Sequence, residues 1–234
     1  MKPWQIWLAS GAVALVGGFT GAAIYQVSGL GHAQTRAYLV DNPDVLPAMA
    51  DALMAQEAAG RLAQVADEVK SPFPGAVLGN PDGSRTLVKF TDYACGYCRA
   101  SVPDVERLVA NDPELKVVIR EWPVFPGSEG AARMALAAAQ QGRFEQFHKA
   151  MFAAGTPSPE TVERAARAAG LDLDAARKFA ASDEASAALA RNDALAEALG
   201  FQGTPSWVAG DAVLNGMVGY DRLAEALARS DAGA

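Results

Sequence analysis

The chain has 234 residues, of which 50% are hydrophobic and 20% charged, and its formal net charge at pH 7 is −7. A chain of this length and hydrophobicity can bury a substantial core, so its body is not expected to be disordered. With a pI near 4.9 and no stripe rich in lysine and arginine, it is not expected to bind nucleic acid.

Residues 1–33 form an apolar segment that is expected to engage a membrane or an export machinery. Residues 3–35 contain no lysine, arginine, aspartate or glutamate, and Lys2 precedes them. Two interpretations stay open: a signal peptide with Gly31-His32-Ala33 as its cleavage site, or an uncleaved anchor, slightly preferred, which needs about 20 apolar residues. In both cases the rest of the chain is predicted to be periplasmic, either tethered to the inner membrane or released.

Residues 34–70 are predicted to form a helical arm. Asn42-Pro43 interrupts the pattern early, and Asp41 or Asn42 can cap the helix whose first turn contains Pro43. Apolar residues recur at helical spacing, namely Leu46, Met49, Leu53, Leu62, Val65 and Val69. Because such a stripe has to be buried, the arm either packs on its own domain, serves as a linker, or associates with copies of itself.

Residues 71–234 are predicted to form one domain, which begins at the breaker sequence 71–75. The strands expected in its first half are 76–79, 86–91 and 115–121. One amphipathic helix is expected to run from Cys95 through Leu108, between the second and third strands. A strand, a helix and another strand in this order predict parallel pairing with a right-handed crossover.

The only two cysteines of the chain, Cys95 and Cys98, lie at the start of that helix and are separated by Gly96 and Tyr97. At a helix N-terminus, unpaired backbone N–H groups and the helix dipole favour a thiolate, so Cys95 is predicted to be the nucleophile. Cys98, one turn further, is predicted to be the resolving thiol. The absence of other cysteines fits an exported protein that handles the disulfides of other proteins.

Two other interpretations of the cysteine pair are less favoured. A zinc site needs three or four ligands, and the only further soft ligands, His32 and His148, are not spaced for one, so no metal is expected. A purely structural disulfide across so short a loop would remove little entropy from the unfolded chain.

A helical insertion is predicted at about 127–200, where short breaks divide a segment rich in alanine into four or five helices. Ser158 is expected to cap one helix with Pro159 at its first position, and Asp172 or Asp174 to begin the next.

The C-terminal segment is predicted to form two short strands around the turn Gly210-Asp211 and a helix at 221–229. Pro205, in the sequence Gly203-Thr204-Pro205-Ser206, immediately precedes the first of these strands. By itself this proline is either ordinary punctuation of an edge strand or part of a cis peptide directed toward the cysteines.

The combination of C-x-x-C after a strand, a helical insertion and Gly-Thr-Pro before a hairpin resembles the thioredoxin-fold oxidoreductases of the DsbA group. The resemblance covers residues 75–229, and softer matches lie at 121–123 and 144–148. It implies an α/β thioredoxin fold with an inserted helical subdomain and no cofactor. It also implies a cis Thr204–Pro205 bond beside the cysteines, with Thr204 tuning the thiolate and the neighbouring backbone pairing with substrate.

Within this group the arm is similar to that of the ScsC proteins, which are linked to suppression of copper sensitivity. Residues 38–46 and 90–98 carry the likeness. Some members of that subgroup oligomerise through the arm and isomerise disulfides, whereas others are monomeric. The likeness therefore favours a homo-oligomer that forms through residues 34–70 and leaves the monomer as the alternative.

The sequence departs from the pattern of the group in two places. Lys89 stands where many members have an acidic residue, so the proton-transfer role of that carboxylate is in question, and Asp92 is the nearest substitute. Gly96-Tyr97 replaces the Pro-His of strongly oxidising DsbA. The lack of a histidine predicts a disulfide less oxidising than the about −120 mV of DsbA.

The predicted function is thiol–disulfide exchange on periplasmic protein substrates, with a membrane redox partner that restores the active state. The sequence does not choose between oxidase and isomerase. One alternative is a copper-handling protein that binds Cu(I) through Cys95 and Cys98, although no Met or His cluster accompanies them. Another is a tethered domain in which the arm is the working surface.

Overall fold

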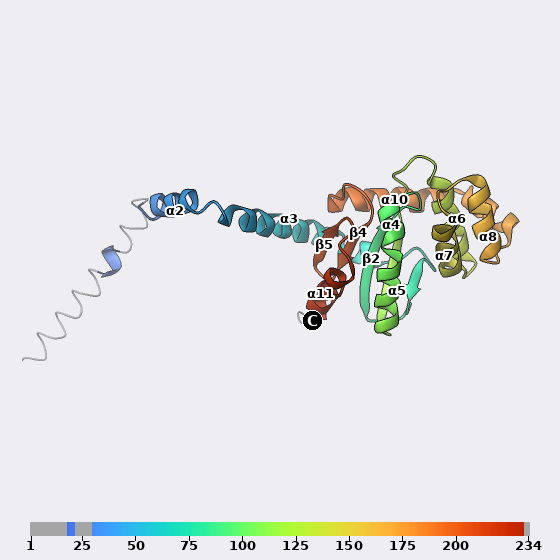
Figure 1. The fold of residues 1–234 in the computed structure, drawn as a ribbon, viewed down its shortest axis with the longest axis horizontal. Helices are drawn as coiled ribbons and strands as arrows, with labels where there is room; N and C mark the ends of the chain where they lie inside the picture. Colours follow the sequence, from blue (N-terminus) through green and yellow to red (C-terminus); the bar gives the residue numbers. More distant parts are fainter. Residues whose placement is uncertain (1–17, 22–29, 232–234) are drawn as a thin grey trace, which may run out of the picture. The chain divides into compact units, whose positions relative to one another are not determined.

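The computed structural model describes residues 18–21 and 30–231, and the chain divides into two compact units, 1–54 and 55–234 (Figure 1). The signal peptide or anchor predicted at 1–33 lies almost entirely outside the described residues. Within the described ranges, no helix is both long and apolar enough to cross a membrane.

The first unit contains helix α2 (Leu30–Asp41) and the beginning of helix α3 (Val45–Lys70). The helix break at Asn42-Pro43 is confirmed, but Asn42 closes α2 instead of capping α3. Both its backbone N–H and its side-chain Nδ2 donate to the Tyr38 carbonyl oxygen, at 2.9 and 2.8 Å. Pro43 has no N–H with which to extend α2, so the helix ends there.

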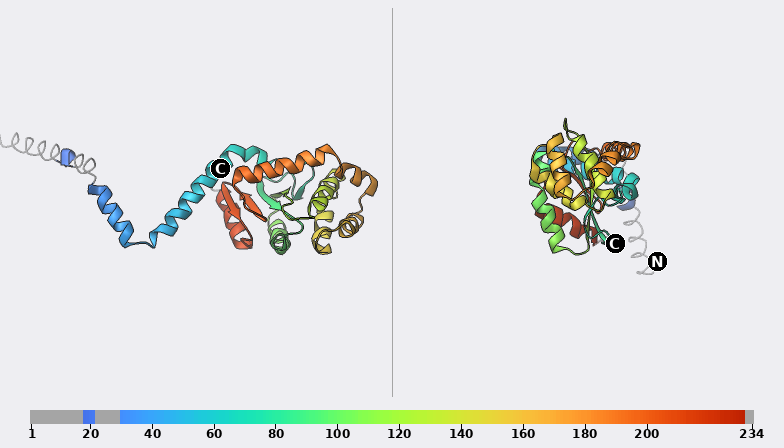
Figure 2. Two further views of the ribbon diagram at one scale, coloured as in Figure 1. Left: turned by 90° about the horizontal axis from the view of Figure 1, so that it is seen from above. Right: turned by 90° about the vertical axis from the view of Figure 1, so that its right-hand side faces the viewer.

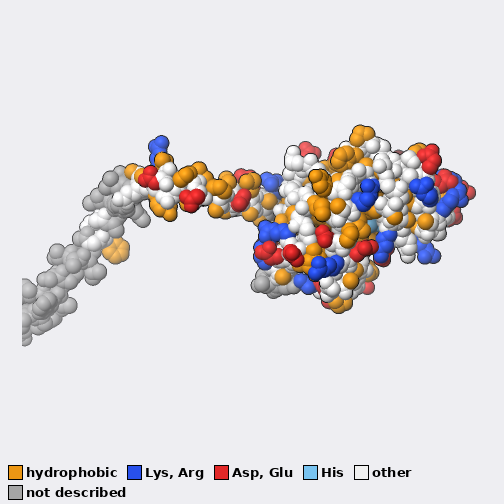
Figure 3. All heavy atoms as spheres, in the orientation of Figure 1, with side chains coloured by type: hydrophobic (Ala, Val, Ile, Leu, Met, Phe, Trp, Pro, Cys, Tyr) orange, Lys and Arg blue, Asp and Glu red, His pale blue; other side chains and the backbone are white. Residues whose placement is uncertain are grey.

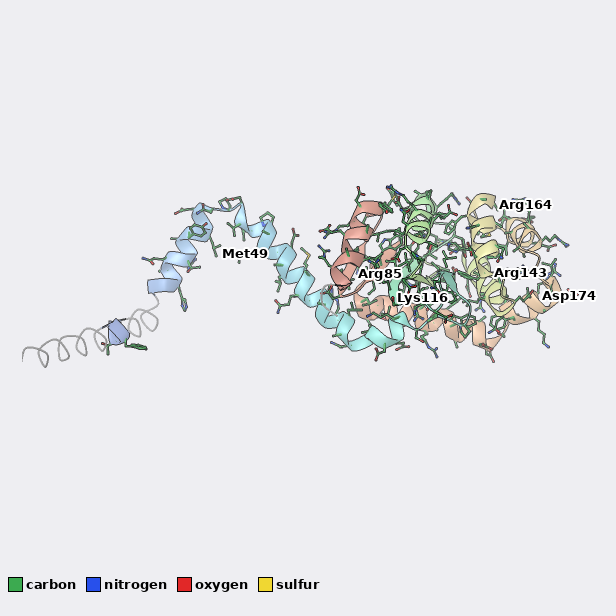
Figure 4. The ribbon with its side chains drawn as sticks, turned by 90° about the horizontal axis from the view of Figure 1, so that it is seen from below. Met49, Arg85, Lys116, Arg143, Arg164 and Asp174 are labelled. Atoms are coloured by element: carbon green, nitrogen blue, oxygen red, sulfur yellow. The ribbon has the colours of Figure 1, made fainter. Side chains whose placement is uncertain are left out.

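Large apolar side chains of the first unit remain exposed, and Figure 3 shows hydrophobic atoms along both of its helices. On α2 and α3 they are Tyr38, Val40, Leu46, Met49, Leu53 and Met54. Met49 projects away from the ribbon of α3 in Figure 4. Self-association through this arm stays a prediction.

The second unit is built on a five-stranded sheet with the order β1-β3-β2-β4-β5. Its strands are β1 (Val77–Gly79), β2 (Arg85–Thr91), β3 (Leu115–Glu121), β4 (Ser206–Ala209) and β5 (Ala212–Asn215). β2 and β3 pair in parallel, as predicted, whereas the other neighbours are antiparallel. The predicted strands and the hairpin at Gly210-Asp211 are therefore confirmed.

The described helices of this unit that follow α3 are, in chain order, α4 (Gly96–Ala100), α5 (Val102–Asn111), α6 (Glu129–Gln140), α7 (Phe144–Ala154), α8 (Pro159–Ala168), α9 (Leu173–Ala180), α10 (Asp183–Leu199) and α11 (Tyr220–Asp231). The five helices α6 to α10 form the predicted insertion. Ser158 caps α8 with Pro159 in its first turn, and Asp172 caps α9, both as predicted.

The single helix expected from Cys95 through Leu108 is wrong, because the chain forms α4 and α5 with a break at Ser101. Pro103 lacks the N–H that would continue the α4 hydrogen-bond ladder, and its ring is tolerated only in the first turn of a helix. The Ser101 hydroxyl donates to the Cys98 carbonyl oxygen at 2.8 Å and so takes up one of the carbonyls freed there.

Helices cover both faces of the sheet, and Figure 2 shows α10 on one side with α5 and α11 on the other. Side chains alternate along β2, so Leu87 and Lys89 face the side of α5, while Val88 and Phe90 face α10. The C-terminal half of α3 packs on the α10 side through Leu62 and Val69. This is the α/β arrangement with a helical insertion that the sequence resemblance implies.

Arg120 on β3 ties the end of α3 to the sheet. Its guanidinium donates to the backbone carbonyl oxygens of Glu68, Val69 and Ser71. Asn192 on α10 supports it, because its Oδ1 accepts from Arg120 at 3.1 Å while its Nδ2 donates to the Glu121 carbonyl oxygen at 2.9 Å. One buried amide thus joins α10 to two consecutive residues of β3.

Asn192→Ala is expected to lower the free energy of unfolding by about 2 kcal/mol, because it leaves a buried guanidinium N–H and a buried carbonyl without their partner. Urea denaturation followed by circular dichroism measures the change. Glu197→Ala, at an exposed position of the same helix, is the matched control and should change stability by about 0.5 kcal/mol or less. Equal stability of the two variants would contradict the role assigned to Asn192.

Candidate active site

Cys95 is the N-cap of α4, and both cysteines are free thiols. The Cys95 sulfur accepts a hydrogen bond from the Cys98 backbone N–H, with 3.3 Å between S and N. Cys98 is fully buried, whereas Cys95 is 2% exposed. The predicted placement of Cys95 at a helix N-terminus is observed, and the two sulfurs lie within one helical turn.

The Thr204–Pro205 peptide bond is cis, as the resemblance implies. The Cys95 thiol donates to the Thr204 carbonyl oxygen, with 3.2 Å between S and O. The loop before β4, although 109 residues away in sequence, therefore contacts the first cysteine directly. Thr204 and Pro205 lie where the sequence predicted them, and their roles in tuning and substrate binding stay predictions.

The Cys98 thiol is difficult to ionise in the resting site. Burial raises its pKa to about 11, and the Asp92 backbone N–H, the Thr204 and Thr91 hydroxyls and the Lys89 charge offset only part of that shift. Both hydroxyls are buried without a hydrogen-bond partner among the described residues. They are therefore available to donate to the Cys98 sulfur when it becomes a thiolate.

Lys89 lies beneath the cysteines on β2. It is 1% exposed, and its Nζ donates to the Cys98 carbonyl oxygen at 3.4 Å. Two aromatic rings flank the amine, that of Phe152 with its centroid at 5.6 Å and that of Trp207 at 5.3 Å. Burial lowers the Lys89 pKa from 10.5 to about 8, and the negative charges of Cys98 and Glu121 offset part of the effect.

A second buried polar group extends from the site into the insertion. The Tyr93 hydroxyl donates to Glu121 Oε1 at 2.9 Å and lies 2.9 Å from His148 Nδ1. Burial raises the pKa of Glu121 well above 4.5 and lowers that of His148 well below 6.5. Glu121 Oε2 has no hydrogen-bond partner in the described part of the chain. Burial therefore disfavours the charged form of both groups.

Asp92 organises the loop that follows β3. Its Oδ1 accepts from the Ala94 N–H at 2.7 Å, and its Oδ2 accepts from the Phe125 N–H and the Ser128 hydroxyl, both at 2.9 Å. The carboxylate thus connects the turn before Cys95 to the segment before α6. Its backbone N–H acts on the Cys98 sulfur, whereas its side-chain oxygens hold this loop.

Gly96 and Tyr97 form the outer edge of the site. Tyr97 is 68% exposed, and a side chain added at Gly96 would meet no atom within 4 Å. Among the described residues of this unit, the exposed large apolar side chains are those of Tyr97, Val124, Phe125 and Met217. Their contact with substrate stays a prediction.

Sequence reasoning missed the buried group formed by Glu121, Tyr93 and His148, because its members come from β3, the turn after β2, and α7. One signal was available. Glu121 ends a strand whose other residues are mostly apolar, and parallel pairing places it opposite Thr91, four residues before Cys95. A carboxyl at that register position had to be buried beside the cysteine turn.

The described residues contain no group of three or more His, Cys, Asp or Glu side chains placed to hold a metal ion. The arrangement offers instead two thiols within one turn, a carbonyl acceptor at the first and a buried amine behind the second. These are the groups needed to form and resolve a mixed disulfide.

The sequence profile of the DSBA-like thioredoxin domain matches residues 86–228, from β2 into α11. The chain belongs to this family. The matched part of this DSBA-like chain includes both cysteines and the Thr204–Pro205 bond, so the resemblance drawn from these motifs is confirmed. DSBA-like proteins are thiol–disulfide oxidoreductases, which is the activity class expected from the sequence.

Three solved structures are similar to this DSBA-like chain. A thioredoxin-like oxidoreductase from Silicibacter pomeroyi DSS-3 is 44% identical, with a TM-score of 0.65 over 68% of this chain and 92% of that one. ScsC of Proteus mirabilis in a transitional conformation is 28% identical, with a TM-score of 0.67 over 87% and 94%. The thiol-disulfide exchange protein alpha-DsbA2 of Wolbachia pipientis is 25% identical, with a TM-score of 0.68 over 75% and 96%.

A curated relative, the Na(+)/H(+) antiporter NhaA 3 of Salinispora tropica, is 30% identical over 135 residues. The match covers 56% of this chain and 21% of the antiporter, so the chain spans about a fifth of that relative's length.

Proposed function

We propose that the protein is an exported thiol–disulfide oxidoreductase that forms or isomerises disulfide bonds in periplasmic proteins. The observation that carries the proposal is the pair of free thiols at the N-terminus of α4, with the Cys98 N–H directed at the Cys95 sulfur. The backbone donor thus lies at the sulfur that is proposed to attack, and the attacking species in disulfide exchange is a thiolate.

In the proposed reaction the Cys95 thiolate attacks one sulfur of a substrate disulfide. A mixed disulfide forms, and the other substrate sulfur leaves as a thiolate with the bonding electron pair. Cys98 then attacks the Cys95 sulfur, which releases the second substrate thiolate and leaves the enzyme disulfide. The same steps in reverse transfer a disulfide to a reduced substrate.

Substrate binding is assigned to the surface around Cys95. The backbone at Thr204, whose carbonyl oxygen lies 3.2 Å from the Cys95 sulfur, is proposed to pair with an extended peptide. Tyr97 and Phe125 expose apolar side chains, and Asp92 fixes the backbone of Phe125. Such a surface suits unfolded chains with exposed apolar side chains.

Export is supported by the uncharged segment 3–35 and by the presence of only one cysteine pair in a chain of this length. The arm is proposed to associate with copies of itself, because Leu46, Met49 and Leu53 expose one apolar face. Self-association would place several active sites in one assembly, which suits isomerisation. A membrane partner is proposed to restore the redox state.

The first test is the equilibrium of the full chain with mixtures of reduced and oxidised glutathione, with the disulfide fraction read by mass after alkylation. We expect a reversible Cys95–Cys98 disulfide with a potential more negative than about −120 mV, because no histidine lies between the cysteines. Absence of a glutathione-dependent disulfide would contradict the proposal. Stoichiometric Cu(I) binding without any exchange would instead support the copper-handling alternative.

Refolding of a substrate with scrambled disulfides separates isomerase from oxidase. The variant Leu46→Gln/Met49→Gln/Leu53→Gln is expected to lose self-association in sedimentation and, with it, most of the isomerase rate. Asp51→Asn, an exposed change on the same helix, is the control. Unchanged isomerisation by a dissociated triple variant would leave the arm without a catalytic role.

A further inference from the structure

We propose that Lys89 is the proton acceptor for Cys98 in the step that resolves the mixed disulfide. The inference rests on the proposed function and assigns a specific residue to one of its steps. It starts from the position of the amine, which lies under the second cysteine instead of at the surface.

The geometry singles out Lys89. Its Nζ lies 3.4 Å from the Cys98 carbonyl oxygen, and among the described residues this is its only hydrogen bond. A thiolate at Cys98 would act on the amine more strongly than any other charge around it. The Phe152 and Trp207 rings flank the amine, and the lysine is 1% exposed.

The surroundings make this lysine a usable base. Burial lowers its pKa to about 8, so about a tenth of the amine is neutral at pH 7 and half at pH 8. The titratable groups that act on it are Cys95 and Cys98 at α4, Asp104 on α5, Glu121 on β3 and His148 on α7. Burial disfavours the charged form of Glu121, which weakens the hold of this carboxyl on the charged form of the lysine.

The other buried groups are not free for this task. Both carboxylate oxygens of Asp92 accept hydrogen bonds from the cysteine turn and the 125–128 loop. His148 and Glu121 both contact the Tyr93 hydroxyl, and no hydrogen bond joins either of them to Cys98. Asp92, which the sequence suggested as the substitute base, is therefore a positioning residue.

The proposed step transfers one proton and exchanges one disulfide bond for another. The neutral Lys89 amine takes the proton from the Cys98 thiol and becomes an ammonium. The resulting Cys98 thiolate, stabilised by that charge and by the Thr91 and Thr204 hydroxyls, attacks the Cys95 sulfur of the mixed disulfide. The Cys95–Cys98 bond forms, the bond from Cys95 to substrate breaks, and the substrate sulfur leaves with the electron pair. The ammonium later returns its proton to that thiolate or to solvent.

The test separates formation of the mixed disulfide from its resolution. The full chain, reduced, is mixed with oxidised glutathione, quenched at set times with acid and weighed by mass spectrometry, at several pH values between about 6 and 9. The adduct of glutathione on Cys95 and its conversion into the Cys95–Cys98 disulfide differ in mass. Each variant is thus scored for the two steps separately.

Lys89→Met, which keeps the apolar stem, is expected to slow resolution at pH 7 by about 10²-fold and to move its pH midpoint upward. Lys89→Arg keeps a positive charge but cannot accept a proton, so it is expected to be similarly slow. Lys116→Met is the control and should match the wild type. Lys116 lies at the start of β3, the opposite end of the strand from Glu121, and is labelled in Figure 4.

If Lys89→Arg resolved the mixed disulfide at the wild-type rate, the inference would be overturned in favour of a purely electrostatic role. If Lys89→Met did so, both the proton-acceptor role and the electrostatic role would be overturned. Near-UV circular dichroism shows whether each variant is folded, and Lys89→Gln is a second neutral replacement if Lys89→Met is not. Failure of the wild-type chain to form any adduct on Cys95 would instead contradict the proposed function.

Discussion

Replacing Cys98 with serine is expected to stop turnover with the substrate still attached to Cys95 through a mixed disulfide. Cys95 keeps its position at the N-cap of α4 and its hydrogen bond from the residue 98 backbone N–H, so the first attack proceeds. The hydroxyl at residue 98 cannot displace the substrate sulfur. Turnover should fall by about 10³-fold or more, and non-reducing electrophoresis should show covalent adducts.

Cys95→Ser is the matched control, because it makes the same atomic change at the other thiol. It is expected to lose turnover equally but to form no adduct, since Cys98 is fully buried and its thiol is held protonated. Adducts that persisted in Cys95→Ser, or turnover that survived in either variant, would reverse or remove the roles assigned to the two thiols.

Glu121→Gln is expected to stabilise the folded chain, by an amount that grows as the pH rises from about 5 to about 7.5. Burial raises the pKa of Glu121 well above 4.5, so the folded chain keeps a proton that the unfolded chain releases. The contribution of Glu121 to the free energy of unfolding is therefore complete below pH 4.5. It is lost above that pH, by at most about 1.4 kcal/mol per pH unit. Glutamine has no proton to lose and still accepts from Tyr93.

Urea denaturation at several pH values measures this difference. The series stays below pH 8, because Lys89 acts with the opposite sign. Its pKa falls from 10.5 to about 8 on folding, so stability rises with pH between these two values. Glu197→Gln makes the same chemical change at an exposed site of α10 and should follow the wild type. Parallel curves for Glu121→Gln and the wild type would show that Glu121 is charged in the folded state.

The parts of the fold that sequence predicts well are those specified by local patterns. Each of these patterns occupies only a few consecutive residues. Examples are the apolar runs of β2 and β3, the cap at Ser158 and the cysteine pair after a strand. The prediction of one continuous helix from Cys95 through Leu108 is wrong at Ser101. The amphipathic pattern continues across this point, but Pro103 lacks the N–H that would continue the helix. Asn42 closes α2 instead of capping α3, and the sequence does not separate these two roles because an asparagine can serve in either.

The parts of the site that sequence does not predict are contacts between distant segments. Lys89 was recognised only as a departure from the family pattern, and nothing near it in sequence showed what surrounds it. Trp207 faces it through antiparallel pairing, while Phe152 arrives from the helical insertion. Only the folded chain shows that a lysine in an apolar strand lies behind the resolving thiol.

The pairing of Lys89 with Trp207 has a practical consequence. The indole ring lies 5.3 Å from the amine, is fully buried, and is held by a hydrogen bond from its Nε1 to the Gly216 carbonyl oxygen. The emission of a rigid, water-free indole depends on the charge beside it. Trp207 is therefore an intrinsic fluorophore positioned to report the protonation state behind Cys98 in real time, without a label.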